Sequence, residues 1–460
     1  MFARRRFVQA SAAAAVLGMS ATACGRGGDS PAPGGAGGGE GHEFATDATG
    51  TLKTMGFNPG DEVGQSRADH AAEQLPEVTV EMDTTNFDSQ KFTAQAAAGQ
   101  VADLIQLDRS AVATFAANHL ILPLDQGFEV HGVDPAQLYY EPAVAEVSHD
   151  GAIYAIPQFF QPNAIVVNTR AAEAAGVAPE DFDTSDPEMF LRTVETATSM
   201  EGSTPLTLGF DGDIPGSVEM WLQVFGGGSI GQDGAPTLDT PENLEALTWI
   251  KQVLDLQGGY AEVTSLKNAM DVFGAENQYV TDQVVAQSWA QWYLNVLTDT
   301  AEQVDIQVVP VKDRDGKPFA FAGGTCFAVP SRAANPDAAL AWALSVTSTE
   351  AWLKAGEARE ASAQEAGGIN TGVFSGSPVA DQQIREQFVQ ETGDPDFDQA
   401  IPVYYDILAD PRATGSSLAG DQIKQALTDA VTAAVGGEKE PQQALTDAQA
   451  AAMREFESNS

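Results

Sequence analysis

The sequence is short of cysteine, of basic side chains and of long hydrophobic runs. Cys24 and Cys326 are the only cysteines among 460 residues, so stability must come from an apolar core rather than from disulfide bonds. Lys and Arg number 23 against 65 Asp and Glu, and nucleic acid is therefore a poor partner, because phosphate contacts need clustered basic residues. No apolar run after the N-terminal segment reaches the roughly 20 residues of a membrane-spanning helix. We expect a soluble body.

Common motifs of catalysis, phosphate binding and metal binding are also missing. The five histidines are scattered without zinc-ligand spacing, and neither a Gly-x-Ser-x-Gly elbow nor a phosphate-binding loop occurs. Gly226, Gly228 and Gly231 match the dinucleotide-binding spacing. That motif needs a strand before the glycines and a helix after them, whereas residues 221–225 are helix-like and Pro236 breaks any following helix. We expect no catalytic residue, no cofactor and no metal.

Two features leave other functions open. Tyr139-Tyr140 and Tyr404-Tyr405 are paired tyrosines of the kind that can bind ferric iron as phenolates. Together with the acidity they keep a cation, polyamine or iron ligand as an alternative. The many carboxylates could always supply a pair for glycan hydrolysis, but such a pair must stand at a fixed separation across a cleft. A sequence gives no such separation, so an anchored glycan hydrolase is the second alternative.

The N-terminal segment has the pattern of an export signal. Three arginines at 4–6 precede an apolar run over 10–19, which is too short to span a bilayer. The segment resembles a twin-arginine signal, and Ala-Thr-Ala-Cys at 21–24 resembles a bacterial lipobox. We predict a signal peptide over 1–23 and lipidation of Cys24; an ordinary secretory signal with an incidental cysteine is the alternative.

Glycine is abundant directly after the predicted lipidation site. Residues 25–43 hold nine glycines and two prolines without hydrophobic periodicity, which is typical of a flexible linker. We predict that residues 24–47 form the lipidated cysteine and a tether, which would reach roughly 25 Å for about 20 residues. Such a segment would hold a globular body near the outer face of the cell membrane and let it move freely.

The remaining chain alternates strand-like and helix-like segments, which favours an α/β architecture. Proline directly after a capping side chain is a helix start signal. We expect strands over 51–57, 78–82 and 103–107, and helices over 87–98 and after the pairs Asp186-Pro187 and Thr240-Pro241.

Several segments resemble, in order, the motifs of a known family. They lie at 78–82, 92–98, 102–105, 121–125, 151–157, 164–168, 287–289, 323–330 and 440–445. The family is the extracellular solute-binding proteins of ABC importers, family 1, which includes maltose-binding protein. The chain departs from the family pattern at Ala102, Val167 and Gln287, where Pro, Tyr and Gly are usual. The resemblance rests on the shared order of motifs from about 51 to 456 rather than on identity.

The resemblance implies a two-lobed α/β fold of the periplasmic-binding-protein type II class, with hinge strands joining the lobes. Lobe 1 is expected to comprise residues 48–157 and 324–375, and lobe 2 residues 158–323 and 376–460. The ligand would sit between the lobes. They would close around it because the closed form makes the better ligand contacts.

The resemblance also suggests ligand-binding residues. Trp289 aligns with a family tryptophan that stacks on sugar, and sugars need aromatic platforms and polar partners for their hydroxyls; a core tryptophan is the alternative. Asp108 and Arg109 resemble a sugar-binding pair and follow a predicted strand; a surface ion pair is the alternative. Asn58 and Asp61 follow the first predicted strand, where a simple turn is the alternative. Phe159, Phe160 and Gln161 stand at the expected interlobe crossing, and Trp221 precedes Gly226-Gly227, as an aromatic residue does in relatives. Gly323 and Gly324 would let the backbone approach the ligand or would only permit the hinge.

Export signal, tether and resemblance together predict a receptor rather than an enzyme. We expect a monomer outside the cytoplasm, anchored to the membrane only through its N-terminal lipid. It would capture a mono- or oligosaccharide by hinge closure and deliver it to the permease subunits of an ABC transporter.

Overall fold

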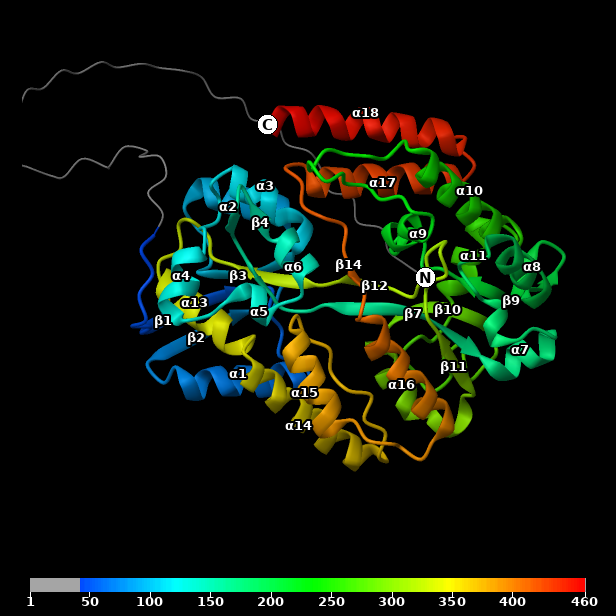
Figure 1. Cartoon of the computed structure of the whole chain (residues 1–460), viewed down its shortest axis with the longest axis horizontal. Coiled ribbons are helices and arrows are strands. Elements are labelled where there is room, and N and C mark those ends of the chain that lie inside the picture. Colours follow the sequence, from blue (N-terminus) through cyan, green and yellow to red (C-terminus); the bar gives the residue numbers. More distant parts are fainter. Residues whose placement is uncertain (1–41, 460) are drawn as a thin grey trace, which may run out of the picture. The chain divides into compact units, whose positions relative to one another are not determined.

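The computed structural model of this chain describes residues 42–459 (Figure 1). The predicted signal peptide, Cys24 and most of the predicted tether lie outside the described residues. Residues 42–47, expected to end the tether, instead pack against the body. Phe44 is 4% exposed, and its N–H donates to Gln126 Oε1 at 2.6 Å. The packed body therefore begins a few residues earlier than predicted, because a large apolar side chain gains by joining the core.

Helices and strands alternate through the described residues, as the α/β prediction requires. The strands are β1 (Gly50–Met55), β2 (Val78–Asp83), β3 (Leu104–Asp108), β4 (Ser148–His149), β5 (Ala152–Ile153), β6 (Ile156–Pro157), β7 (Gln161–Asn168), β8 (Ser199–Glu201), β9 (Thr204–Asp211), β10 (Val284–Ala290), β11 (Ile306–Val309), β12 (Ala320–Gly323), β13 (Thr325–Ala328) and β14 (Pro411–Arg412).

No helix within residues 42–459 combines the length and apolarity needed to cross a membrane. The helices are α1 (Glu62–Gln74), α2 (Ser89–Ala98), η1 (Arg109–Ala111), α3 (Val112–Ala117), α4 (Asp125–His131), α5 (Pro135–Leu138), α6 (Glu141–Glu146), α7 (Thr169–Ala175), η2 (Pro179–Asp181), α8 (Pro187–Ala197), α9 (Val218–Val224), α10 (Pro241–Asp255), α11 (Tyr260–Lys267), α12 (Trp292–Leu297), η3 (Thr298–Gln303), α13 (Pro336–Val346), α14 (Thr349–Ala366), α15 (Pro378–Phe388), α16 (Pro395–Ile407), α17 (Gly420–Val435) and α18 (Pro441–Asn459).

The helix start and stop signals act as expected. Asp186 accepts a hydrogen bond from the N–H of Met189 at 2.9 Å, and α8 follows. Thr240 accepts in the same way at the start of α10. Gly99 takes a left-handed conformation with φ of 68° and ends α2. The three predicted helices are thus confirmed, although the helix expected over 87–98 begins at Ser89.

The first sheet has the strand order β2-β1-β3-β13-β6. β1 pairs parallel with β2 and β3, whereas β13 runs antiparallel to β3 and β6. Leu52 of β1 and Leu104 of β3 lie in one core with Trp342 of α13. Three neighbouring parallel strands place their carboxyl ends at one edge of this sheet, where ligand-binding loops commonly gather.

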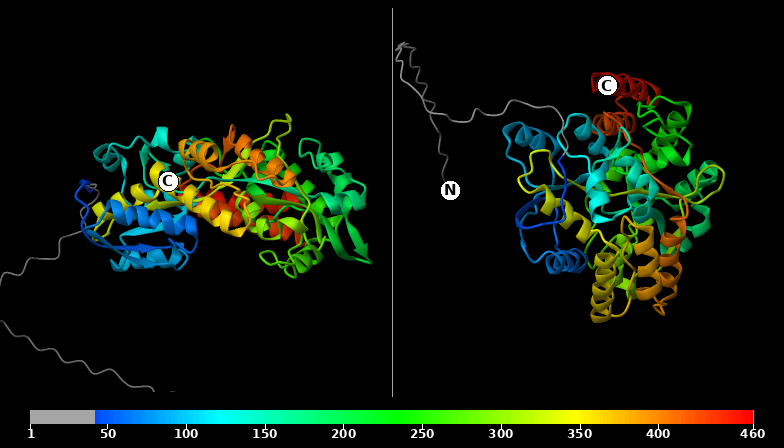
Figure 2. Two further views of the ribbon diagram at one scale, coloured as in Figure 1. Left: turned by 90° about the horizontal axis from the view of Figure 1, so that it is seen from below. Right: turned by 60° about the vertical axis from the view of Figure 1, so that its left-hand side comes forward.

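The second sheet is built around β7. Its order is β14-β12-β7-β10-β9-β8, with β11 also pairing with β7. β10, β11 and β12 all run antiparallel to β7. Ile165, Val166 and Val167 are fully buried in succession. Consecutive buried residues show that both faces of a sheet are covered. In Figure 1 β1, β2 and β3 of the first sheet lie on the left of the described body and β9, β10 and β11 of the second sheet lie on the right, and the left-hand view of Figure 2 shows the same separation of the blue and green parts of the chain.

The chain passes from the first sheet to the second between β6 and β7, and returns at Gly324 between β12 and β13. A third segment reinforces the first passage. The N–H of Phe160 donates to Ser375 O at 3.0 Å, and the N–H of Gly376 donates to Gln158 O at 2.8 Å. The passages lie where the hinge strands were expected, and the lobe boundaries themselves stay a prediction.

Two neighbouring glycines in the return passage, Gly323 and Gly324, allow a matched test of packing by substitution. A Cβ on Gly324 would lie 2.0 Å from Phe159 O and 2.7 Å from Arg109 Nη1, whereas one on Gly323 meets nothing within 4 Å. Gly324→Ala should lower the free energy of unfolding by about 1–3 kcal/mol through overpacking. Gly323→Ala should change it by less than about 0.5 kcal/mol. Urea unfolding measures both, and equal stabilities would contradict the close approach at Gly324.

Candidate functional site

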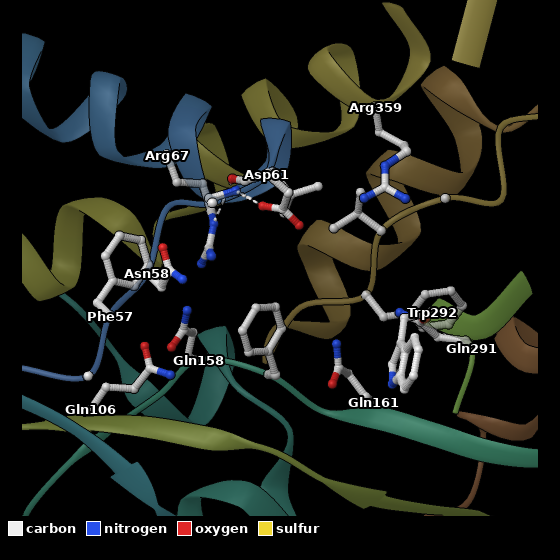
Figure 3. A pocket seen from close by; sticks show the side chains of 18 of the residues that line it. Phe57, Asn58, Asp61, Arg67, Gln106, Gln158, Gln161, Gln291, Trp292 and Arg359 are labelled. Atoms are coloured by element: carbon white, nitrogen blue, oxygen red, sulfur yellow. Dashed lines mark hydrogen bonds between the residues drawn. The ribbon is translucent and has the colours of Figure 1, made fainter. Parts of the chain in front are cut away.

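A cavity of about 460 Å³, the main cavity, lies where the two sheets meet (Figure 3). The loop after β1 and Asn86 after β2 form one wall, with Gln106 of β3. The passage from β6 to β7 contributes residues at the floor, and the segment after β10 closes the opposite side. Its position at the carboxyl ends of β1, β2 and β3 follows from the parallel pairing of those strands.

The polar lining of the main cavity consists largely of uncharged amides. They come from both sheets and from the passage between them: Asn58, Asn86, Gln106, Gln158, Gln161 and Gln291. With its amide oxygen turned toward Arg67, Gln158 donates to Gln106 Oε1 at 3.2 Å and to Thr325 Oγ1 at 3.1 Å. An amide offers both donors and an acceptor. Such a lining can satisfy a ligand that carries several hydroxyl groups.

Aromatic rings complete the lining. Phe57, Phe159, Phe374 and Trp292 line the main cavity. Trp292 begins α12 and lies nearly parallel to Phe273, with ring centroids 6.2 Å apart. Phe273 is 70% exposed, so the aromatic surface continues outward from the cavity. Flat rings at the rim of a polar cavity suit a ligand with an apolar face.

Two guanidinium groups and one carboxyl group carry the charge of the lining. Arg67 is 2% exposed, and its guanidinium carbon lies 4.0 Å from the centroid of the Trp352 ring. Burial lowers the pKa of Arg67 to about 9, although the nearby Asp61 carboxylate opposes this effect. Asp61 Oδ1 accepts from the N–H of Gly64 at 2.7 Å and so caps α1. Arg359 pairs with Glu62 at 2.5 Å.

The structure brings four of the predicted ligand-binding residues together. Asn58, Asp61, Phe159 and Gln161 all line the main cavity. They come from the loop after β1 and from the passage between the sheets. These residues were predicted from two signals, a position at the end of a strand and a position at the expected crossing. Both signals therefore point to the main cavity.

Trp289 lies behind the cavity wall rather than in it. Its ring stacks on Tyr293 with centroids 4.0 Å apart, and its Nε1 donates to Gln287 Oε1 at 2.7 Å. Trp292, three residues later, lines the main cavity in its place and meets Trp289 edge to face at 5.6 Å. The partly buried Trp289 therefore supports the lining tryptophan.

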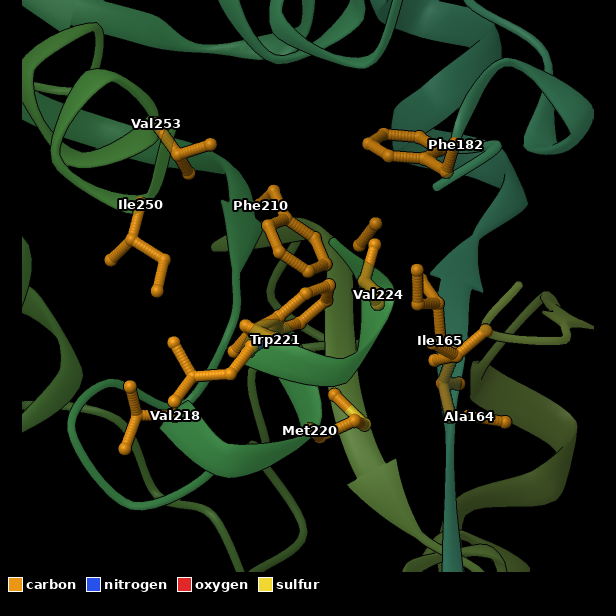
Figure 4. Packing of buried hydrophobic residues seen from close by; sticks show 14 of the residues in the cluster. Ala164, Ile165, Phe182, Phe210, Val218, Met220, Trp221, Val224, Ile250 and Val253 are labelled. Atoms are coloured by element: carbon orange, nitrogen blue, oxygen red, sulfur yellow. The ribbon is translucent and has the colours of Figure 1, made fainter. Parts of the chain in front are cut away.

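Phe160 and Trp221 are core residues in this structure. Phe160 is fully buried and stacks on Tyr140, with centroids 4.7 Å apart. Trp221 is also fully buried; its Nε1 donates to Gly212 O at 2.8 Å, and its ring lies beside Phe210 (Figure 4). Neither side chain reaches the main cavity. Both are candidates in the sequence analysis because of their position in the chain, and in this structure both side chains fill the interior.

Asp108, Arg109, Gly323 and Gly324 line a different space. This second cavity, of about 320 Å³, lies beside η1, α9 and α17. Asp108 pairs with Lys424 at 2.9 Å, and both side chains are 60% exposed. The exposed ion pair of Asp108 is thus made with Lys424, and not with Arg109 as the alternative in the sequence analysis supposed.

Arg109 is buried and binds protein groups on three sides. Nε donates to Glu146 Oε2 at 2.6 Å, Nη1 to Phe159 O at 2.6 Å and Nη2 to Ala322 O at 2.7 Å. The same Glu146 accepts from the N–H of Thr414 at 3.0 Å. One ion pair thus joins both passages between the sheets to the segment that follows β14. The expectation that Arg109 hydrogen-bonds a ligand is corrected by these contacts.

The paired tyrosines are buried phenols. Tyr140 donates to Asp381 Oδ2 at 2.9 Å, and Tyr404 donates to Trp289 O at 3.0 Å. Burial raises the pKa of both, and also that of Tyr139 and Tyr405. Since iron binding uses phenolates, these environments oppose the ionisation that such a site needs.

Sequence reasoning missed several lining residues. Arg67 lies on α1 one turn after Val63 and Gly64, which also line the cavity. It stands six residues after Asp61, a spacing that does not place two residues on one helix face, so the choice of Asp61 did not point to it. Trp292 stands beside the residue chosen in its place. Arg359 and Phe374 come from segments far along the chain, and no local pattern in the sequence links them to the loop after β1.

Comparison with known proteins gives one family match. The family model described as bacterial extracellular solute-binding protein matches residues 67–366. Among curated proteins the sequence has no significant match.

Many solved structures share the fold, all at low identity among those compared. CpMnBP1 with mannobiose bound has a TM-score of 0.70 at 20% identity, covering 87% of this chain and 99% of that chain. The GacH receptor of Streptomyces glaucescens, solved with acarbose, has a TM-score of 0.66 at 18% identity, covering 89% and 99%. A solute-binding protein from Thermotoga lettingae with bound α-D-tagatose has a TM-score of 0.66 at 17% identity, covering 89% and 100%. The two-lobed type II fold expected from the sequence is confirmed.

The contacts of Arg109 predict a large stability effect. Arg109→Met would leave Glu146, whose side chain is 7% exposed, without its cation, and breaking a buried pair in this way costs about 3–5 kcal/mol. Arg385→Met is the matched control, because the Arg385–Asp406 pair is 41% and 67% exposed and should contribute less than about 1 kcal/mol. Urea unfolding compares the two. Similar losses would contradict the role given to Arg109.

Proposed function

Since this chain belongs to the bacterial extracellular solute-binding proteins, we propose that it captures a mono- or oligosaccharide in the main cavity and delivers it to the permease of an ABC transporter. The observation that carries the proposal is the pairing of Trp292 with the amides Gln161 and Gln291 across one cavity. The ring offers a platform for the apolar face of a sugar, and the amides offer donors and acceptors for its hydroxyl edge.

The structural neighbours support a carbohydrate ligand. CpMnBP1 was solved with mannobiose and with mannotriose, and the GacH receptor was solved with acarbose. At identities of 18–20%, the similarity to these structures shows a shared fold and nothing about the ligand. The ligand class for this chain therefore rests on its own lining residues.

Capture would proceed by closure of two lobes about the passages between the sheets. We assign residues 48–157 and 324–375 to lobe 1 and residues 158–323 and 376–460 to lobe 2. The main cavity takes side chains from both assignments, such as Asn58 and Gln291. A sugar that contacts both walls favours the closed form, because those contacts form together only there.

The alternatives fit the main cavity less well. Its basic lining residues are Arg67 and Arg359, and Asp61 is its one acidic lining residue among those described. A cation or polyamine would meet more positive than negative charge there. Glycan hydrolysis by the usual mechanism needs two carboxyl groups across the bond, and the cavity lining supplies one. We therefore propose a receptor rather than an enzyme.

The anchor belongs to the same proposal. Lipidated Cys24 would hold the monomeric receptor outside the cytoplasm, where its family acts, and several acyl chains suffice for stable anchoring. In cells of the native host, Cys24→Ala should abolish incorporation of labelled fatty acid and release the protein from the membrane fraction. Fatty acid incorporation and membrane association that both persist would contradict lipidation at this residue.

Isothermal titration against a panel of mono- and oligosaccharides tests the ligand class. We expect saturable heat with at least one sugar and unchanged sugar on product analysis. Shorter glycans after incubation would establish a hydrolase, and binding of a polyamine or metal ion without any sugar binding would overturn the proposal.

Trp292 provides the variant for the same titration. Trp292→Ala removes an apolar contact worth about 1.5–3 kcal/mol, so affinity for the sugar identified by the panel should fall about 10- to 100-fold. Trp292→Phe keeps a ring and should restore most of the affinity. If Trp292→Ala binds like the parent protein at equal thermal stability, the platform lies elsewhere.

A further inference from the structure

We propose that the preferred ligand is an acidic saccharide whose carboxylate is held by Arg67. This inference rests on the proposed function, because it names the class of sugar that the same cavity selects. It starts from one feature of the lining: a buried guanidinium that faces the cavity without an ionic partner.

Arg67 has no carboxylate partner among residues 42–459. No Asp or Glu oxygen lies within 4.0 Å of its nitrogens. Its Nε donates to Val63 O at 3.2 Å, and its two terminal nitrogens face the amide oxygen of Gln158 at 3.2 and 3.3 Å. All of these acceptors are neutral. Buried charges in proteins are ordinarily paired, so this one stands apart.

The charge balance of the main cavity is the reverse of that of the whole chain. The chain carries 65 acidic and 23 basic residues, yet the lining holds Arg67 and Arg359 against Asp61. Arg359 has its partner in Glu62, and one oxygen of Asp61 is used to cap α1. Asp61 acts on Arg67 through space but forms no ion pair with it within 4.0 Å, so among the described residues the guanidinium has no charged acceptor in direct contact.

The surroundings of Arg67 fix its orientation. The guanidinium lies 4.0 Å from the Trp352 ring centroid and 5.2 Å from that of Phe159. Rings that pack against the face of a guanidinium leave its N–H groups at the edge free to donate in plane. Figure 3 shows the Arg67 side chain directed from α1 into the space above Asn58 and Gln158.

A carboxylate group on the ligand would bind the Arg67 guanidinium more favourably than a hydroxyl group would. A carboxylate accepts two parallel N–H···O bonds from a guanidinium. It also supplies the negative charge that the buried guanidinium lacks in direct contact. Burial, which the nearby Asp61 carboxylate offsets only in part, lowers the pKa of Arg67 to about 9. A neutral sugar would satisfy hydrogen bonds but leave the buried charge uncompensated.

The remaining lining explains why the acid should be a sugar. Gln106, Gln161 and Gln291 present amides along the floor and far wall, and Trp292 presents a ring. A simple organic acid would use the guanidinium and leave these groups without partners. A uronic acid residue, alone or within a short oligosaccharide, uses both.

The test is a titration with matched sugar pairs that differ only at the carboxylate. Suitable pairs are glucuronic acid with glucose, and a galacturonic acid disaccharide with the corresponding galactose disaccharide. We expect the acid of at least one pair to bind more than about 10-fold tighter than its neutral partner, as a charge-assisted bidentate contact provides. Arg67→Met should abolish that preference, and Arg67→Lys should keep part of it.

Controls separate this proposal from the function on which it rests. Arg385→Met removes a partly exposed guanidinium that does not itself line the main cavity and should leave the preference unchanged. Equal or tighter binding of the neutral sugars to the parent protein overturns the acidic ligand and leaves sugar capture standing. No binding of any sugar overturns both. The parent comparison decides the question even if Arg67→Met fails to fold, which its melting curve would reveal.

Discussion

The buried ion pair of Arg109 and Glu146 is the constraint on which the arrangement of the two sheets depends. Arg109 donates to the carbonyls of Phe159 and Ala322, one in each passage between the sheets. Glu146 also accepts a hydrogen bond from the N–H of Thr414, which follows β14, and so ties that segment to the same ion pair. A guanidinium can serve several acceptors at once because its donors form a rigid planar fork. The passages are thereby held in register beneath the main cavity, while the walls above belong to separate sheets.

The position of the main cavity follows from this anchoring. The passage between β6 and β7 supplies Gln158 and Gln161 to the floor. One wall carries Arg67 and the loop after β1, and the other carries Gln291 and Trp292. Walls from different sheets can approach each other without disturbing either core. A ligand that contacts both walls binds most tightly when the walls are close together. Its binding therefore shifts the protein toward the closed conformation.

Local chemistry made much of the fold predictable. Capping side chains before proline located α8 and α10, and strand-end positions correctly placed Asn58 and Asp61 beside the cavity. Local chemistry did not reveal where a long side chain points. Arg109 turns away from the main cavity because it donates hydrogen bonds to Glu146, 37 residues later, and to two backbone carbonyls that are distant in sequence. The choice between Trp289 and Trp292 likewise depends on how Tyr293 packs: it stacks on Trp289 at 4.0 Å and meets Trp292 edge to face at 5.8 Å. Such choices are tertiary, and one sequence does not display them.

The central claim is that two lobes close upon a sugar held between their walls. Small-angle X-ray scattering of the protein with and without a saturating sugar tests this most directly. We expect a smaller radius of gyration in the bound state and a return to the larger value when the sugar is removed. Scattering curves that superimpose while calorimetry shows the cavity to be filled would contradict closure about the Arg109–Glu146 pair.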